Sequence, residues 1–84
     1  MSEARRTVVV SDPMGLHARP AAQMAKAAGK FKCDVRIVHD GQTADAKSIV
    51  QLLGLFVPGG ASVEVVAVGD DAAACVEAVA RAVL

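Results

Sequence analysis

The chain has few aromatic residues and no excess of charge of either sign. Aromatics make up 2% of its 84 residues, and nine basic residues balance nine acidic ones. Nucleic-acid-binding proteins use basic surfaces and aromatic stacking platforms, so this composition argues against that class. The longest apolar stretch, residues 52–57, is too short to span a bilayer, and residues 8–10 are too short for a signal-peptide core. We therefore expect a cytoplasmic protein that binds no nucleic acid and inserts into no membrane.

Cysteine and histidine are also scarce. Cys33 and Cys75 lie far apart in the chain, without the C-x-x-C spacing of a zinc or redox motif. We expect two reduced, buried thiols. His39 ends a predicted strand without a neighbouring ligand pattern, so it is not expected to bind a metal. No cofactor is expected.

Apolar residues are plentiful but small, since much of the 54% hydrophobic content is alanine and valine. The length indicates one domain. Apolar patterning predicts four strands and three helices, in the order β-α-β-β-α-β-α. The strands are expected at 7–10, 34–39, 42–45 and 62–68, and the helices at 18–28, 48–54 and 72–83. Such an order predicts an α+β fold of two layers, an open-faced sandwich with the helices on one face of the sheet.

Several local signals bound these elements. Gly29 is expected to stop the first helix. Asp40-Gly41 is typical of a tight type I′ hairpin, and residues 58–60 predict another turn. Gly69-Asp70-Asp71 is expected to cap the last helix. The buried face of the first helix is expected to be mostly alanine, namely Ala18, Ala21, Ala22, Ala25 and Ala28.

The segment around His17 carries the strongest functional signal. Pro20 is tolerated in the first turn of a helix but not in its interior, so the helix should begin near residue 17 or 18. His17 is then the N-cap, and the amides of Ala18 and Arg19 lack intrahelical acceptors. Such a helix end favours phosphate, and the Arg19 guanidinium adds a charged donor. A nucleophilic imidazole therefore lies where an attached phosphoryl group would be stabilised.

The second helix combines a capping residue with an excess of apolar side chains. Ser48 is a good N-cap. Leu52 and Leu55 are expected to face inward, which leaves an apolar patch that one short helix cannot bury. An exposed apolar patch on a small protein usually marks a partner site. Lys26 and Lys47 are expected to form a positive rim facing acidic partners. The patch consists of Ile49, Val50, Leu53 and Phe56.

The chain resembles the HPr family, the histidine-containing phosphocarriers of the bacterial phosphoenolpyruvate:sugar phosphotransferase system. Residues 15–21, Gly-Leu-His-Ala-Arg-Pro-Ala, match the active-site motif of that family at every position. Residues 46–49, Ala-Lys-Ser-Ile, match its second, regulatory-serine motif. The resemblance covers essentially the whole chain and implies an antiparallel four-stranded sheet covered by three helices.

The resemblance also implies a function. Nδ1 of His17 would accept a phosphoryl group from phosphorylated enzyme I and pass it to enzyme IIA domains of sugar transporters. Arg19 would stabilise the group, Pro20 would shape the helix start, and Ser48 would be a regulatory site for a kinase/phosphorylase. The protein would be a monomeric carrier rather than an enzyme. The implied partner surface comprises Leu16, Ala22, Lys26, Lys47, Ile49, Val50, Leu53 and Phe56.

Two positions depart from the family. Met14 stands where a small polar residue is common, so a polar group near His17 is expected to be missing. Phe56 stands where glycine is common, so the path after the second helix is expected to differ.

Three other functions stay open. One is a nitrogen-type regulatory carrier, and another is a protein whose Ser48 state governs binding to transcriptional regulators. The third is an RNA-binding module of similar topology, which the neutral charge and the missing sheet aromatics disfavour.

Overall fold

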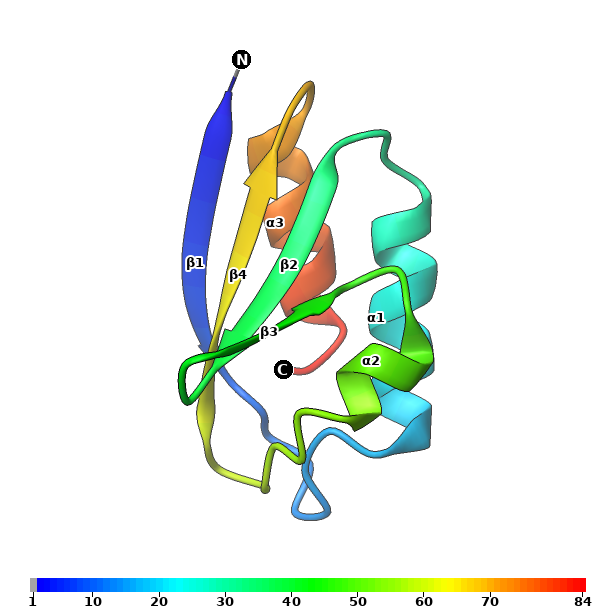
Figure 1. Cartoon of the computed structure of the whole chain (residues 1–84), viewed down its shortest axis with the longest axis vertical. Coiled ribbons are helices and arrows are strands. Elements are labelled where there is room, and N and C mark those ends of the chain that lie inside the picture. The colour runs from blue at the N-terminus through cyan, green and yellow to red at the C-terminus, as the bar shows by residue number, and fades with distance from the viewer. Residues whose placement is uncertain (1) are drawn as a thin grey trace.

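Four antiparallel strands and three helices form the two layers of the structure (Figure 1). The computed structural model describes residues 2–84. The strands lie in the order β1-β4-β2-β3, with the helices on one face, so the predicted open-faced α+β sandwich is confirmed. The elements are β1 (Glu3–Val9), α1 (Ala18–Gly29), β2 (Asp34–His39), β3 (Gln42–Asp45), α2 (Ile49–Leu53), β4 (Ser62–Val68) and α3 (Ala72–Arg81).

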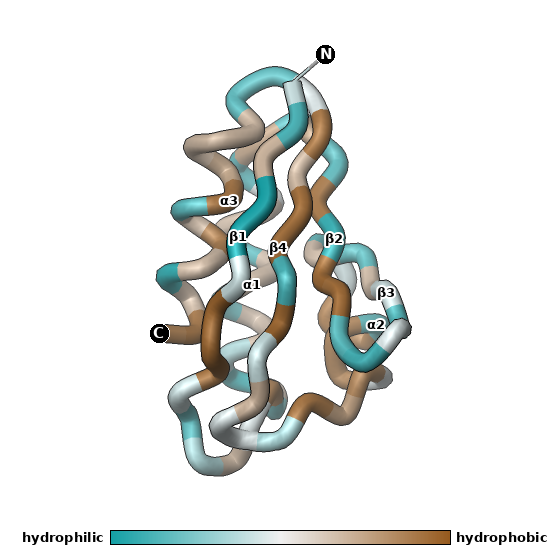
Figure 2. The backbone as a smooth tube through the Cα atoms, turned by 90° about the vertical axis from the view of Figure 1, so that its left-hand side faces the viewer, coloured by the Kyte–Doolittle hydropathy of each residue, from teal (hydrophilic) through white to brown (hydrophobic). Residues whose placement is uncertain are grey.

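The sheet forms because its strands alternate between apolar and polar residues. In the central strand β4, Val63, Val65 and Ala67 are buried beneath the helices. The opposite face of the sheet is open, and Figure 2 views the sheet from that side. There Arg5 forms ion pairs with Glu3 and Glu64. One face therefore builds the core and the other meets solvent.

The core is entirely apolar within residues 2–84. Its largest fully buried side chains include Met24, Ile37 and Leu52, which come from α1, β2 and α2. Cys33 and Cys75 are buried free thiols, as predicted. Burial, followed by contact with the Cys33 thiol, raises the pKa of Cys75 to about 12. All three helices therefore depend on the sheet to cover their apolar sides.

Most predicted boundaries are confirmed, since β2, β3 and β4 match and α2 follows its predicted N-cap, Ser48. Asp40 and Gly41 both have positive φ, as a type I′ turn requires. The first strand is longer than predicted, because pairing with β4 extends it back to Glu3. The prediction that Gly29 stops α1 was wrong: Gly29 is helical, and the N–H of Lys30 closes the helix on the carbonyls of residues 27 and 28.

The predicted alanine face of α1 was wrong in part. Ala21 and Ala28 are buried, but Ala18 and Ala22 are exposed, and Ala25 is only partly buried. The buried stripe is rotated toward Pro20 and Met24, which lie on the same side as residues 21 and 28.

The N-cap of α3 lies within the predicted residues 69–71. Asp71 is the N-cap, but its side chain makes no capping hydrogen bond, because its backbone is left-handed with φ of 61°. The helix is instead anchored by its apolar face, which includes the buried residues Ala72, Cys75, Val76, Val79 and Ala80.

Candidate functional site

The loop before α1 packs against the turn that follows α2, at the end of the molecule opposite the N-terminus (Figure 1). The N–H of Leu16 donates to the carbonyl of Val57, at 2.9 Å. Gly15 has a φ of 75°, and a Cβ there would lie 2.1 Å from the Val57 oxygen. Only glycine allows both this backbone conformation and this close approach. The contact fixes the loop that carries the histidine.

His17 is the N-cap of α1, as predicted from Pro20. Its backbone is extended, and its carbonyl accepts the first helical hydrogen bond, from the N–H of Ala21 at 3.0 Å. Its side chain makes no capping bond to the helix. The amides of Ala18 and Arg19 precede the first intrahelical donor, and Pro20 has no N–H. The start of α1 therefore offers two amides and the positive end of the helix dipole beside the imidazole.

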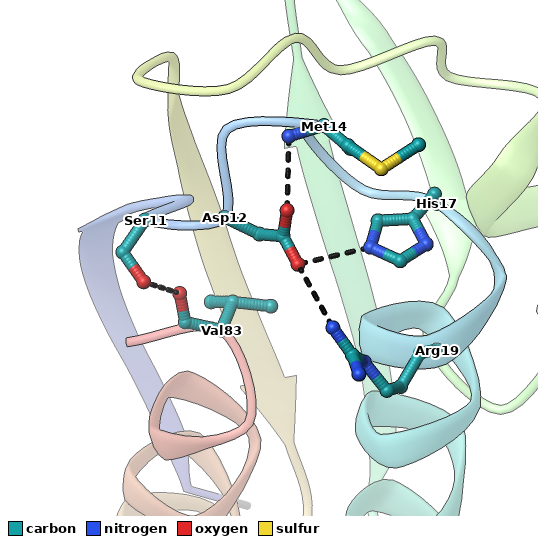
Figure 3. Close-up of polar contacts among 6 residues, drawn as sticks. All are labelled: Ser11, Asp12, Met14, His17, Arg19 and Val83. Carbon is teal, nitrogen blue, oxygen red and sulfur yellow. Dashed lines mark hydrogen bonds and ion pairs between the residues drawn. The ribbon is translucent and has the colours of Figure 1, made fainter.

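The imidazole is held by Asp12, a residue that the sequence analysis did not identify as functional. Nε2 of His17 lies 2.9 Å from Oδ2 of Asp12 (Figure 3). The second oxygen, Oδ1, accepts a hydrogen bond from the N–H of Met14, also at 2.9 Å. The hydrogen bond with His17, followed by that with Met14, lowers the pKa of the Asp12 carboxyl below its ordinary value. The aspartate in the turn signal at residues 11–13 was the available clue, but a turn alone accounts for it.

The expected loss of a polar group at Met14 was therefore wrong. Met14 is exposed and its side chain offers no strong hydrogen-bonding group, but Asp12 reaches the ring from two residues earlier. A polar group does lie beside His17, and Asp12 supplies it instead of residue 14.

Arg19 lies on the same side of the helix start as Asp12. One guanidinium nitrogen is 3.7 Å from Oδ2 of Asp12, so the two groups form a loose ion pair (Figure 3). The Arg19 side chain is 74% exposed. An exposed arginine in so loose a pair is free to turn toward another anion.

An open cavity of about 450 Å³ begins at His17 and extends toward the end of α2. Apart from the imidazole it is lined by apolar side chains: Met14, Leu16, Leu53, Phe56, Val57 and Pro58. Phe56 in this lining is 85% exposed, Val50 on α2 is 80% exposed, and Ile49 and Leu53 are also exposed. Leu52 and Leu55 are buried, as expected. The sequence-predicted apolar patch is thus exposed and continuous with the histidine.

Phe56 adopts a left-handed backbone conformation, with φ of 51°. Bulky residues are rarely found there, and the conformation costs about 1–2 kcal/mol. Phe56 is therefore an exposed aromatic residue on a strained backbone, and the expected difference in path from the family stays a prediction.

The other predicted partner residues differ in exposure. Ala22 and Lys26 are exposed on α1. Leu16 was expected on the partner surface, but it is only 4% exposed because its side chain joins the core. Lys47 is exposed, as a positive rim requires, and its ammonium also donates to the carbonyl of Phe31 at 2.8 Å. Of the predicted partner residues, Leu16 is therefore the one that the structure buries.

Ser48 caps α2 as predicted. Its hydroxyl oxygen accepts a hydrogen bond from the N–H of Gln51, at 3.2 Å. The side chain of Gln51 in turn accepts from the N–H of Asp45, at 2.9 Å. A side chain from the same segment therefore caps one of the free amides at this end of α2.

No cluster of three potential metal ligands occurs among residues 2–84. Over the same residues, no helix has the length and apolar character needed to cross a membrane.

The comparisons with known proteins agree with this geometry. A family model described as the PTS HPr component phosphorylation site matches residues 4–83. Phosphocarrier protein HPr of Mycoplasma capricolum is 30% identical over 81 residues, which cover 96% of this chain and 91% of that protein.

Solved structures extend the match to three dimensions. HPr from Bacillus anthracis is 36% identical, with a TM-score of 0.91 and full coverage of both chains. An HPr dimer from Thermoanaerobacter tengcongensis is 35% identical, with a TM-score of 0.71 over 86% of this chain and 83% of that one. The protein therefore belongs to the HPr family of phosphotransferase-system phosphocarriers.

Proposed function

We propose that His17 accepts a phosphoryl group from phosphorylated enzyme I and passes it to enzyme IIA domains of sugar transporters. One observation carries this proposal: His17 is the N-cap residue of α1, next to the free amides of the helix start, and Arg19 pairs with the same carboxylate as the imidazole. A neutral ring nitrogen is a competent nucleophile toward phosphorus. The role is that of a covalent carrier rather than an enzyme.

The groups around His17 suit a phosphoryl anion. Its oxygens would accept hydrogen bonds from the amides of Ala18 and Arg19, aided by the helix dipole. The Arg19 guanidinium would supply a planar pair of charged donors. Pro20 fixes the helix start and leaves only those two amides ahead of the first intrahelical donor. The phosphoryl group is thus stabilised without a closed pocket. A carrier that serves two partners requires such an open site.

The apolar surface beside His17 is proposed to dock both donor and acceptor proteins. It combines the cavity next to the imidazole with the exposed residues of α2 and α1. The strain held at Phe56 supports a functional role, since a non-glycine residue in that conformation persists where other constraints outweigh it. We propose that the docking residues are Ala22, Lys26, Lys47, Ile49, Val50, Leu53 and Phe56.

Ser48 is proposed as a regulatory phosphorylation site. Its hydroxyl is near the exposed Ile49 and Val50, so a phosphate would add charge beside an apolar docking surface. We expect such a modification to weaken docking of enzyme I. Transcriptional regulators are the expected readers of the phosphorylated form in hosts that possess the kinase/phosphorylase.

Intact-protein mass spectrometry after incubation with enzyme I and phosphoenolpyruvate tests the proposal. We expect one added, acid-labile phosphoryl group in the wild type and none in His17→Ala. His39→Ala is the matched control, because His39 is the other histidine and its Nδ1 lies 3.3 Å from the carbonyl of Ser62. A folded wild type that gains no phosphoryl group, with enzyme I active on a control carrier, would refute the carrier role.

Two further points are proposed with that role. Cytoplasmic location and a monomeric state fit a carrier that meets successive partners, and light scattering measures the second point directly. Transfer assays with sugar-type and nitrogen-type acceptor domains distinguish the sugar branch from the regulatory one.

A further inference from the structure

The Asp12 carboxylate joins three parts of the site. Oδ1 accepts from the N–H of Met14, and Oδ2 lies 2.9 Å from Nε2 of His17 and 3.7 Å from the Arg19 guanidinium (Figure 3). Its side chain is 24% exposed and that of His17 is 27% exposed. The pair is partly shielded from water, so the hydrogen bond constrains the ring more than a fully exposed one would.

This contact determines which ring nitrogen carries the proton. An ionised carboxylate can only accept hydrogen bonds, so Nε2 must be the donor. In a neutral imidazole the other nitrogen, Nδ1, then keeps its lone pair. Within residues 2–84 the ring makes no other hydrogen bond, and the cavity that His17 borders is otherwise lined by apolar residues. The tautomer is therefore set by Asp12 alone among the described residues.

We propose, resting on the carrier function above, that Asp12 is a positioning residue for phosphoryl transfer. It holds His17 as the Nε2–H tautomer, with Nδ1 as the nucleophile. It also keeps Arg19 near the ring until the phosphoryl group supplies a stronger anionic partner.

The transfer balances without a separate base. The Nδ1 lone pair forms the new bond to phosphorus while the bond from phosphorus to the donor breaks, and that electron pair leaves with the donor. The ring retains its Nε2 proton and gains a positive charge. That charge develops 2.9 Å from the Asp12 carboxylate, which stabilises it. On transfer to an acceptor the steps reverse, and the ring returns to its neutral Nε2–H form.

Asp12→Asn is the most informative variant. The amide oxygen can keep the Met14 N–H bond, which places the NH₂ group where Oδ2 was. That group would donate to Nε2 and favour the tautomer with the proton on Nδ1. The same exchange disables the histidine of serine proteases. We expect initial phosphorylation by enzyme I to fall about 10- to 100-fold, as for the loss of a charge-assisted hydrogen bond.

Nitrogen-15 NMR of the imidazole gives a readout that a merely structural role would not move. When the ring is in its neutral form, the free wild type should show a protonated Nε2 and an unprotonated Nδ1, and Asp12→Asn should show the reverse. Asp70→Asn is the matched control: it removes an exposed carboxylate in the loop before α3, and both the ring spectrum and the rate should stay unchanged.

The outcomes separate this inference from the carrier function. A wild-type ring protonated mainly on Nδ1 would overturn the positioning role, even if Asp12→Asn fails to fold. So would a folded Asp12→Asn variant with the wild-type tautomer and rate. A wild type that shows the Nε2–H tautomer but gains no phosphoryl group would refute the carrier function while leaving the tautomer assignment intact.

Discussion

The N-terminus of α2 has a side-chain cap, whereas the N-terminus of α1 has none. Both helices begin with amides that lack intrahelical acceptors. At α2 the Ser48 side chain accepts from Gln51, and the Gln51 side chain accepts from Asp45. At α1 the His17 side chain turns away from the helix toward Asp12. The start of α2 therefore carries a side-chain cap that serves stability, whereas the start of α1 has no side-chain cap and leaves its histidine to a neighbouring carboxylate.

The largest effect should come from disrupting the backbone contact with Val57 that supports the loop before α1. Gly15→Ala would place a Cβ 2.1 Å from the Val57 oxygen, with further backbone atoms at 2.9 Å. We expect a loss of roughly 3 kcal/mol or more in the free energy of unfolding, because backbone must move. Gly41→Ala is the control, since its φ of 77° is similar but nothing lies within 4 Å. That variant should lose only about 1 kcal/mol. Equal losses in urea unfolding would show that backbone conformation, not close approach, explains Gly15.

Altering the capped N-terminus of α2 should change stability without changing phosphoryl transfer. Ser48→Ala removes the acceptor for the Gln51 amide, so we expect a loss of about 1 kcal/mol and wild-type phosphorylation of His17. Ser48→Asp keeps a capping oxygen and adds charge near the docking surface. It should retain stability but bind enzyme I more weakly, as measured by calorimetry. A transfer rate lowered in Ser48→Ala to the same degree as in Ser48→Asp would contradict this separation.

Phe56 tests whether the strain after α2 is retained for docking. Phe56→Gly removes the left-handed penalty, and we expect a gain of about 0.5–1 kcal/mol in the free energy of unfolding, after the greater chain entropy of glycine is subtracted. Affinity for enzyme I should fall, because an exposed aromatic is lost. Phe56→Leu keeps the strain and much of the apolar surface, so it should resemble the wild type in both measurements. A Phe56→Gly variant with unchanged affinity would remove Phe56 from the docking surface.

The smallest expected effect is on acid stability. Because the folded-state pKa of Asp12 is lowered, its carboxylate contributes stability above its unfolded value of about 3.9. That contribution is lost as the pH falls through the lower folded value. Thermal melts should therefore show the wild type more stable than Asp12→Asn near neutral pH, with the difference shrinking below pH of about 4. A difference that is constant from neutral pH down to strongly acidic pH would exclude this linkage.

These contrasts also explain what the sequence could predict. Local signals located the strands β2, β3 and β4, because alternation and the Asp40-Gly41 turn depend on neighbouring residues alone. Pro20 likewise located His17 at the N-cap. The extension of β1 back to Glu3 needed its partner β4, which lies about sixty residues away in the sequence.

The site shows the same limit. His17 and Arg19 lie in a contiguous motif, whereas Asp12 becomes visible only once the loop folds back and brings its carboxylate to the ring. Leu16 was assigned to the partner surface by motif position, but packing directs its side chain inward. Burial and hydrogen-bond partners are three-dimensional properties that residue spacing does not supply.

The pairing of β1 with β4 also constrains how the protein is made. Residues 3–9 hydrogen-bond to residues 62–68, and α3 follows that strand. During synthesis the first strand therefore waits, without its partner, until most of the chain has left the ribosome. The loop that carries His17 cannot reach its final shape earlier, because the carbonyl of Val57 that anchors it is also made late. Closing such long loops slows folding compared with proteins of local contacts. A nascent chain of this protein should thus acquire its phosphoryl-accepting geometry in a single late step.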